Sequence, residues 1–163
     1  MGNIGHIQEV NLVTSLNSTV SANPMMRLGF ICVQNAGRSQ MSAAFAKRER
    51  GHRGLKDSVD IITGGTDPAD SVHEEVMTVM DEVDIDLSGQ TPREVSTTEL
   101  ESCDIVATMG CSTLDIDDAK ADIRDWSLDD PHNKTIEEVR AIRDEIENRV
   151  KTLFDQAETQ ITQ

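Results

Sequence analysis

Hydrophobic residues along the chain follow two alternating spacings. Short apolar runs of strand length lie at LGFICV (28–33), VDIIT (59–63) and DIVATM (104–109), with a weaker one at IRDWSL (123–128). Apolar residues spaced three and four apart, which indicate amphipathic helices, lie over 39–50, 72–83 and 136–157. Strands that alternate with helices predict an α/β fold, with a parallel sheet covered by helices on both faces.

Signals at the ends of these elements refine the prediction. Ser71 with Glu74, and Thr135 with Glu138, have the spacing of a capping box, so a helix is expected to begin at each pair. TTELES (97–102) predicts a short helical turn, and the Gly-Gly pair after VDIIT is expected to break the second strand.

The first residues lack the hydrophobic periodicity found in the rest of the chain. Residues 1–24 show no sustained period and lack the basic start and apolar core of a secretory signal. We expect a poorly ordered N-terminal extension over 1–24, followed by a single domain over 25–163. A chain of 163 residues can bury a core without disulfides or metals.

Charge narrows the classes of partner. The chain has 30 acidic and 15 basic residues and a net charge of −15, which disfavours nucleic acid and anionic membrane surfaces. No apolar run approaches the roughly 20 residues of a membrane span. Scarce lysine and abundant carboxylates are typical of halophilic proteins, although an ordinary acidic cytosolic protein has a similar balance. Three cysteines indicate a reducing compartment, so a cytoplasmic location is expected.

The segment after the first strand carries the chemistry. Cys32 ends the strand, five residues separate it from Arg38, and a helix begins at Arg38 or Ser39. Ligands of open α/β sheets bind at the carboxyl ends of strands, and a loop that leads into a helix N-terminus presents backbone N–H groups to an anion. The alternative is a buried core cysteine beside a surface arginine.

Within this loop each residue has a physical task. The Cys32 thiolate would be stabilised by amide dipoles and by a hydrogen bond from Ser39, while Arg38 offers two donors to an oxyanion. Gly37 permits a positive φ, and Asn35 tolerates a left-handed conformation and braces the loop. The expected oxyanion-binding residues are Val33, Gln34, Asn35, Ala36, Gly37, Arg38 and Ser39.

A thiolate that attacks an oxyanion needs an acid for the departing oxygen. The candidate is the loop Asp129-Asp130-Pro131 before the last helix, where Pro131 restricts Asp130 to an extended conformation. A solvated acidic turn is the alternative for this segment.

These segments together resemble the low-molecular-weight protein tyrosine phosphatase superfamily, and within it the thiol-dependent arsenate reductases. The resemblance covers about four-fifths of the chain. It rests, in this order, on FICVQNAGRSQMSAAFA, TGGTDPADSVHEEVMTVMDEVDIDLSGQTPREV, DIVATMGC and DWSLDDPHNKTIEEVRAIRDEIENRV. It implies a three-layer sandwich with a four-stranded parallel sheet in the order 2-1-3-4. It also implies Cys32 as nucleophile, Arg38 and the loop amides as oxyanion binders, and Asp130 as general acid.

Two activities of this superfamily share the first step. A phosphatase hydrolyses the phosphocysteine, whereas a reductase needs a second thiol that attacks the Cys–arsenic adduct and releases arsenite. The chain has no tyrosine, and His132 follows the Asp-Pro pair where phosphotyrosine enzymes carry aromatic walls, so arsenate reduction is favoured. Hydrolysis of phosphotyrosine or small phosphate esters is the alternative, and a non-catalytic oxyanion sensor is a third hypothesis.

The second thiol is the open question. Cys111 follows the third strand, where thioredoxin-linked reductases carry a resolving cysteine, but their further cysteine about seven residues on is missing. Either Cys111 forms a disulfide with Cys32, or a small thiol attacks and Cys111 is a bystander. A thioredoxin-like or glutaredoxin-like protein or a small thiol would supply the electrons, and no bound cofactor is expected.

The remaining cysteine, histidines and tryptophan receive structural predictions. Cys103 matches no motif and is expected to be buried in the core. No histidine has ligand spacing, so no metal site is expected. His73 is placed within a helical turn and His132 in a solvated turn, with the pocket mouth as the alternative for His132. Trp126 is expected to pack beneath the Asp-Pro loop.

Overall fold

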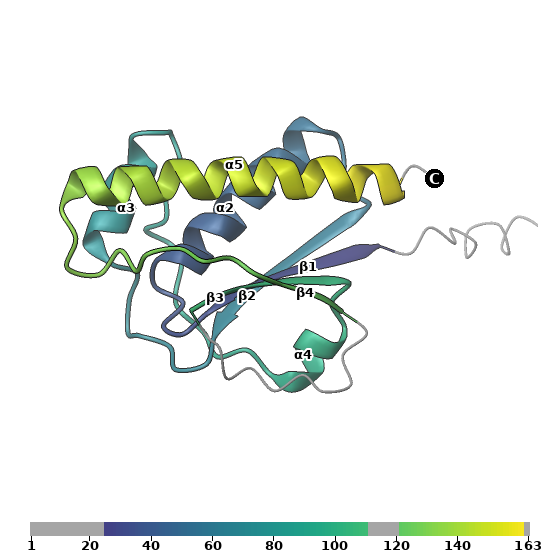
Figure 1. The fold of residues 1–163 in the computed structure, drawn as a ribbon, viewed down its shortest axis with the longest axis horizontal. Coiled ribbons are helices and arrows are strands. Elements are labelled where there is room, and N and C mark those ends of the chain that lie inside the picture. The colour runs from purple at the N-terminus through teal and green to yellow at the C-terminus, as the bar shows by residue number, and fades with distance from the viewer. Residues whose placement is uncertain (1–24, 111–120, 162–163) are drawn as a thin grey trace, which may run out of the picture.

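The computed structural model describes residues 25–110 and 121–161, and it contains one parallel sheet (Figure 1). The strands are β1 (Met26–Cys32), β2 (Val59–Gly65), β3 (Ile105–Met109) and β4 (Asp122–Asp125). The helices are α2 (Arg38–His52), α3 (Glu74–Asp81), α4 (Thr97–Glu101) and α5 (Ile136–Ile161). The sheet order is β2-β1-β3-β4 with every pairing parallel, which confirms the fold that the family resemblance implied.

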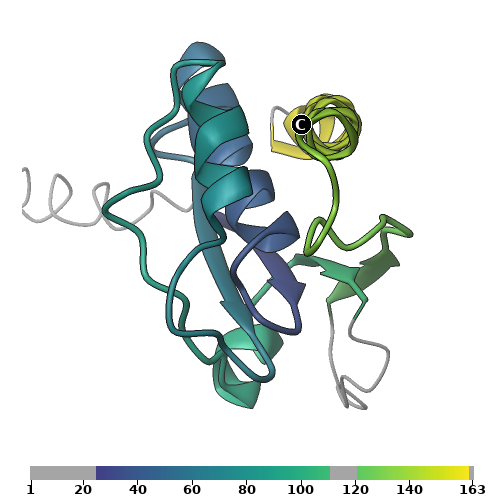
Figure 2. The same cartoon turned by 90° about the vertical axis from the view of Figure 1, so that its left-hand side faces the viewer.

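Helices lie on both faces of the sheet, so the molecule has three layers. α5 and α2 pack against each other on one face, with α3 beside α5, while the short helix α4 lies on the opposite face (Figures 1 and 2). Successive strand residues therefore enter two cores. Phe30 and Cys32 belong to the large core under α2 and α5, whereas Ile31 packs with Leu100 of α4 in the small one.

The last helix shows how the apolar stripe determines packing. Its predicted capping box is present, because Glu138 N donates to Thr135 Oγ1 and Thr135 N donates to Glu138 Oε1. The predicted stripe is buried at Val139, Ile142, Ile146, Val150, Leu153 and Ala157. The stripe holds α5 along the sheet and fixes the loop that leads into it.

An ion-pair cluster fastens α3 to α5. Glu82, just after α3, accepts hydrogen bonds from Arg140 and Arg143 of α5, and these bonds lower the pKa of Glu82 to about 2. Arg143 Nη1 also donates to the carbonyl of Val79 at 2.8 Å. The carboxylate is therefore kept ionised while it joins the two helices.

Three local predictions were wrong. Ser71 and Glu74 do not form a capping box. α3 begins two residues later than that pair predicts, with His73 as its N-cap, and the His73 side chain makes no capping hydrogen bond. The Gly-Gly pair does not break β2, which includes both glycines. A Cβ on Gly64 would lie 2.7 Å from Val95, so glycine allows this close approach. β4 ends before Trp126.

The predicted extension over 1–24 and the residue Cys111 lie outside the described residues. No helix in the described part of the chain is both long and apolar enough to cross a bilayer.

Candidate active site

The carboxyl ends of β1 and β3 meet at one edge of the sheet and border a small cavity. Cys32 ends β1 and is paired in register with Met109, the last residue of β3. The cavity has a volume of about 230 Å³, and its lining residues come from four segments of the chain. They are Cys32, Val33, Gln34, Gly37, Arg38, His73, Gly110 and Asp130. The three residues predicted to carry the chemistry therefore surround one space.

Cys32 lines this cavity and is buried, with 3% of its surface exposed. Its Sγ accepts a hydrogen bond from the backbone N–H of Asn35 at 3.1 Å and shares another with Ser39 Oγ at 2.9 Å. α2 begins at Arg38, so the positive end of the helix dipole also points toward the sulfur. All three features favour the negatively charged thiolate.

Asn35 holds the loop in shape from inside. It is fully buried with a φ of 51°, the left-handed conformation expected for it. Its Nδ2 donates to Ser39 Oγ at 2.7 Å and to Thr63 Oγ1 at 2.9 Å, and its Oδ1 accepts from Gln40 Nε2 and from the Arg93 backbone N–H. Sequence reasoning missed Thr63, Gln40 and Arg93. For Thr63 and Gln40 the available signal was a polar residue inside a predicted strand or helix, where burial requires a partner. Arg93 contributes only a backbone N–H, for which the sequence has no signal.

Gly37 has a different role from the predicted one. Its φ is −142°, so the positive φ expected for it is wrong. A Cβ at this position would lie 2.7 Å from Pro131 Cγ and 3.6 Å from His73 Cδ2. Glycine is required here because the Asp-Pro loop packs directly against the anion loop.

Arg38 is held by the loop that carries the candidate acid. Its side chain is 11% exposed; Nη1 donates to the carbonyl of Leu128 at 2.9 Å, and Nη2 lies 3.9 Å from Asp130 Oδ2. On the other side, a Cβ on Gly110 would approach the guanidinium to 2.9 Å, and Gly110 has a φ of 81°. The guanidinium is therefore fixed between the end of β3 and the Asp-Pro loop.

The two neighbouring aspartates face different spaces. Asp130 lines the cavity, and its Oδ1 accepts a hydrogen bond from the His132 backbone N–H at 3.0 Å. Asp129 lines a separate groove along α5 with Lys134 and Glu138. The geometry thus places Asp130, rather than Asp129, beside Arg38.

Two histidines meet at the cavity, which sequence reasoning did not foresee. His73 is not inside a helical turn as predicted but precedes α3 and lines the cavity. The exposed ring of His132 lies 5.1 Å from it, between centroids, with the planes tilted by 34°. No sequence signal pairs these residues, because the contact depends on how two loops are brought together.

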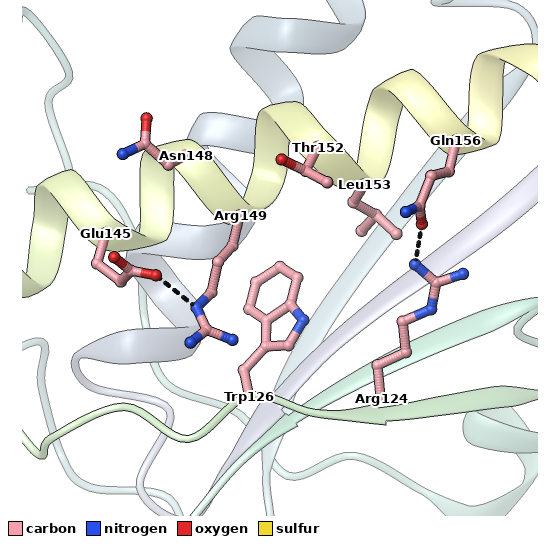
Figure 3. Close-up of a pocket in the computed structure, with 8 residues that line it drawn as sticks. All are labelled: Arg124, Trp126, Glu145, Asn148, Arg149, Thr152, Leu153 and Gln156. Carbon is pink, nitrogen blue, oxygen red and sulfur yellow. Dashed lines mark hydrogen bonds and ion pairs between the residues drawn. The ribbon is translucent and has the colours of Figure 1, made fainter.

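Trp126 and Cys103 lie away from the cavity, as expected for structural residues. Trp126 is buried between the sheet and α5, 5.9 Å from the Phe30 ring, and lines a groove with Arg124 and Arg149 on either side (Figure 3). Burial raises the pKa of Cys103 to about 11, so this thiol stays protonated near neutral pH. Among the described residues, no group of three or more potential metal ligands is brought together.

Fold and cavity define the class of protein: an α/β protein with a buried thiol and an arginine in an anion loop at the edge of a parallel sheet. A family model described as Low molecular weight phosphotyrosine protein phosphatase matches residues 27–163. The chain belongs to this family.

Relatives within the family carry reductase names. A Halobacterium salinarum protein with the provisional name arsenate reductase is 66% identical over 137 residues, covering 84% of this chain and 96% of that protein. A thioredoxin-dependent arsenate reductase of Corynebacterium glutamicum has a TM-score of 0.69 at 29% identity, covering 86% of this chain and 64% of that longer chain. An arsenate reductase in the phosphate-binding state has a TM-score of 0.70 at 27% identity, covering 81% of this chain and 98% of that chain.

Proposed function

We propose that the protein is an arsenate reductase. The observation that carries the proposal is the single cavity of about 230 Å³ that Cys32, Arg38 and Asp130 share. A tetrahedral oxyanion needs little room and a cationic fork, and the small cavity lined by Arg38 fits both needs. The loop that leads into α2 is expected to add backbone amides. The reductase names of the relatives support the same assignment.

The proposed first step uses the three residues together. The Cys32 thiolate attacks As(V), the Arg38 guanidinium and the loop amides bind the remaining oxygens, and Asp130 protonates the oxygen that leaves as water. Arg38 is already oriented by the Leu128 carbonyl, so little reorganisation is needed when the oxyanion binds.

The proposed second step needs another thiol. Its sulfur attacks Cys32 Sγ, the Sγ–As bond breaks, and its electron pair passes to arsenic, which leaves as arsenite. Gly110, which lines the cavity, directly precedes Cys111, and this supports Cys111 as the attacking thiol. A thioredoxin-like or glutaredoxin-like protein or a small thiol in the cytoplasm would then complete the cycle.

The test is arsenite formation from arsenate with different thiol reductants, at low and at high potassium chloride because of the acidic composition. Cys111→Ser should abolish multiple turnover if Cys111 resolves the adduct, whereas Cys103→Ser is the matched control and should retain activity. After one turnover, mass spectrometry should find a Cys32–Cys111 disulfide in the wild type. A small thiol attached to Cys32 would instead mean that the reductant attacks directly.

Phosphate ester hydrolysis is the second candidate, because the matched family is named for phosphotyrosine phosphatases. Both activities begin with the same attack, so they differ only in whether water or a thiol resolves the adduct. The chain has no tyrosine to stack on a phosphotyrosine ring, which favours the small oxyanion. If the protein hydrolyses an aryl phosphate but forms no arsenite with any thiol reductant, it is a phosphatase and not an arsenate reductase.

A further inference from the structure

The imidazole of His73 has an unusual place in the fold. Ser, Thr, Asp and Asn are the usual N-cap residues because their side chains accept a hydrogen bond from the first turn. His73 occupies the N-cap of α3 and makes no such bond. Departures from a local rule of this kind are expected where a residue has a function to perform.

The backbone of His73 is fixed, which gives its ring a defined position. The His73 N–H donates to the Ala36 carbonyl of the anion loop at 3.0 Å, and its carbonyl accepts from Val76 and Met77 in α3 at 3.1 Å. His73 lines the same cavity as Cys32, and its ring packs against that of His132. A histidine whose backbone is hydrogen-bonded to the anion loop therefore lines the same cavity as the nucleophilic cysteine.

The second step of the proposed reaction lacks a base among the residues assigned so far. A thiol attacks as its thiolate, so its proton must be removed. Asp130 is a poor acceptor, because a carboxylate is a much weaker base than a thiolate. Imidazole changes its protonation state near neutral pH and is the stronger base of the two.

We propose that His73 is the general base that deprotonates the thiol resolving the Cys32–arsenic adduct. This inference rests on the proposed reductase function. The thiol proton passes to the imidazole, the new thiolate sulfur bonds to Cys32 Sγ, and the Sγ–As electron pair reduces As(V) to As(III). The imidazolium then releases its proton to water as arsenite leaves.

The charged groups around the ring fit this order of events. Asp130, which gives up its proton in the first step, is a carboxylate in the second and lines the same cavity as His73. Glu74 and Glu75 follow His73 in the first turn of α3, and Arg38 lines the same cavity as His73. The ring of His132 packs on that of His73.

The experiment compares His73→Gln with the wild type in a single turnover of arsenate with a thiol present. We expect arsenite formation near neutral pH to slow roughly 10²–10⁴-fold, the usual effect of a lost general base. Protection of Cys32 from alkylation by phosphate should change by less than about threefold, since binding does not use the imidazole. Added imidazole, or a more acidic thiol that is already ionised, should restore much of the rate.

Two other histidine variants test whether the effect is specific to His73. His52→Gln, at the exposed end of α2, should behave as the wild type. His132→Phe keeps a ring against His73 and should retain the thiol step within about threefold. Wild-type arsenite formation by His73→Gln, or a loss confined to His132→Phe, would overturn the assignment of the base. Absence of arsenite from the wild type itself would instead overturn the proposed function.

Discussion

The contact between the two loops at Gly37 makes a specific prediction about catalysis. In Gly37→Ala the new methyl group would lie 2.7 Å from Pro131 Cγ and 3.5 Å from Pro131 Cδ. The proline ring must therefore withdraw by about 0.7 Å to reach an ordinary contact of 3.4 Å. Asp130 is the preceding residue, so it moves with the ring, while the backbone N–H of residue 37 remains available to an oxyanion.

The size of the effect follows from this displacement. Misplacing a catalytic group by about 1 Å can cost about 100-fold in rate, so we expect kcat for arsenate reduction to fall roughly 10–100-fold. Phosphate should still protect Cys32 from alkylation within about threefold of the wild type, because the loop amides and Arg38 are retained.

Gly51, which lies inside α2, is the control for this substitution. A Cβ on Gly51 meets nothing within 4 Å, so Gly51→Ala should keep full activity and gain up to about 1 kcal/mol of stability from helix propensity. If Gly37→Ala has the wild-type kcat, contact between the loops does not position Asp130 and the reasoning is refuted. Loss of phosphate protection would also refute it, because the change would then have damaged binding.

Three further changes test separate parts of the site and the fold. Asp130→Asn should slow the chemical step roughly 10²–10⁴-fold for a poor leaving group and less for a good one, measured in pre-steady-state kinetics; a larger loss in Asp129→Asn would contradict the assignment. Ser39→Ala removes a hydrogen bond worth about 1.5 kcal/mol or more to a charged acceptor, so alkylation of the nucleophilic thiol at neutral pH should slow about tenfold, and an unchanged rate would exclude that role. The lowered pKa of Glu82 contributes stability above about pH 4.5 that is lost as the pH falls toward 2, so thermal unfolding of Glu82→Gln should depend less on pH in that window than unfolding of the wild type.

The fold was largely predictable because its signals are local. The apolar stripe of α5 and the capping box at Thr135 each depend on residues within a few turns of one another, and both are present. The capping box at Ser71 has the same spacing but does not form. Its loop is instead held by tertiary contacts, such as the bond from His73 N–H to Ala36 O, which begin α3 at Glu74. Spacing alone cannot distinguish these two cases.

In the candidate site, too, the features that depend on nearby residues were predictable and those that depend on tertiary contacts were not. Cys32, Asn35 and Ser39 lie within eight positions of each other, so the strand–loop–helix pattern was sufficient to expect their hydrogen bonds. Gly37 was also inside that loop, yet its role depends on Pro131, a residue far away in the chain. A glycine in a sequence predicts freedom of the backbone, whereas here it provides space for another loop. The imidazole of His73 is a second example, because only the arrangement of the strands brings it to the cavity. A loop sequence therefore predicts which residues surround an oxyanion, but the groups proposed to move protons around that oxyanion come from other loops, and their assignment requires the fold.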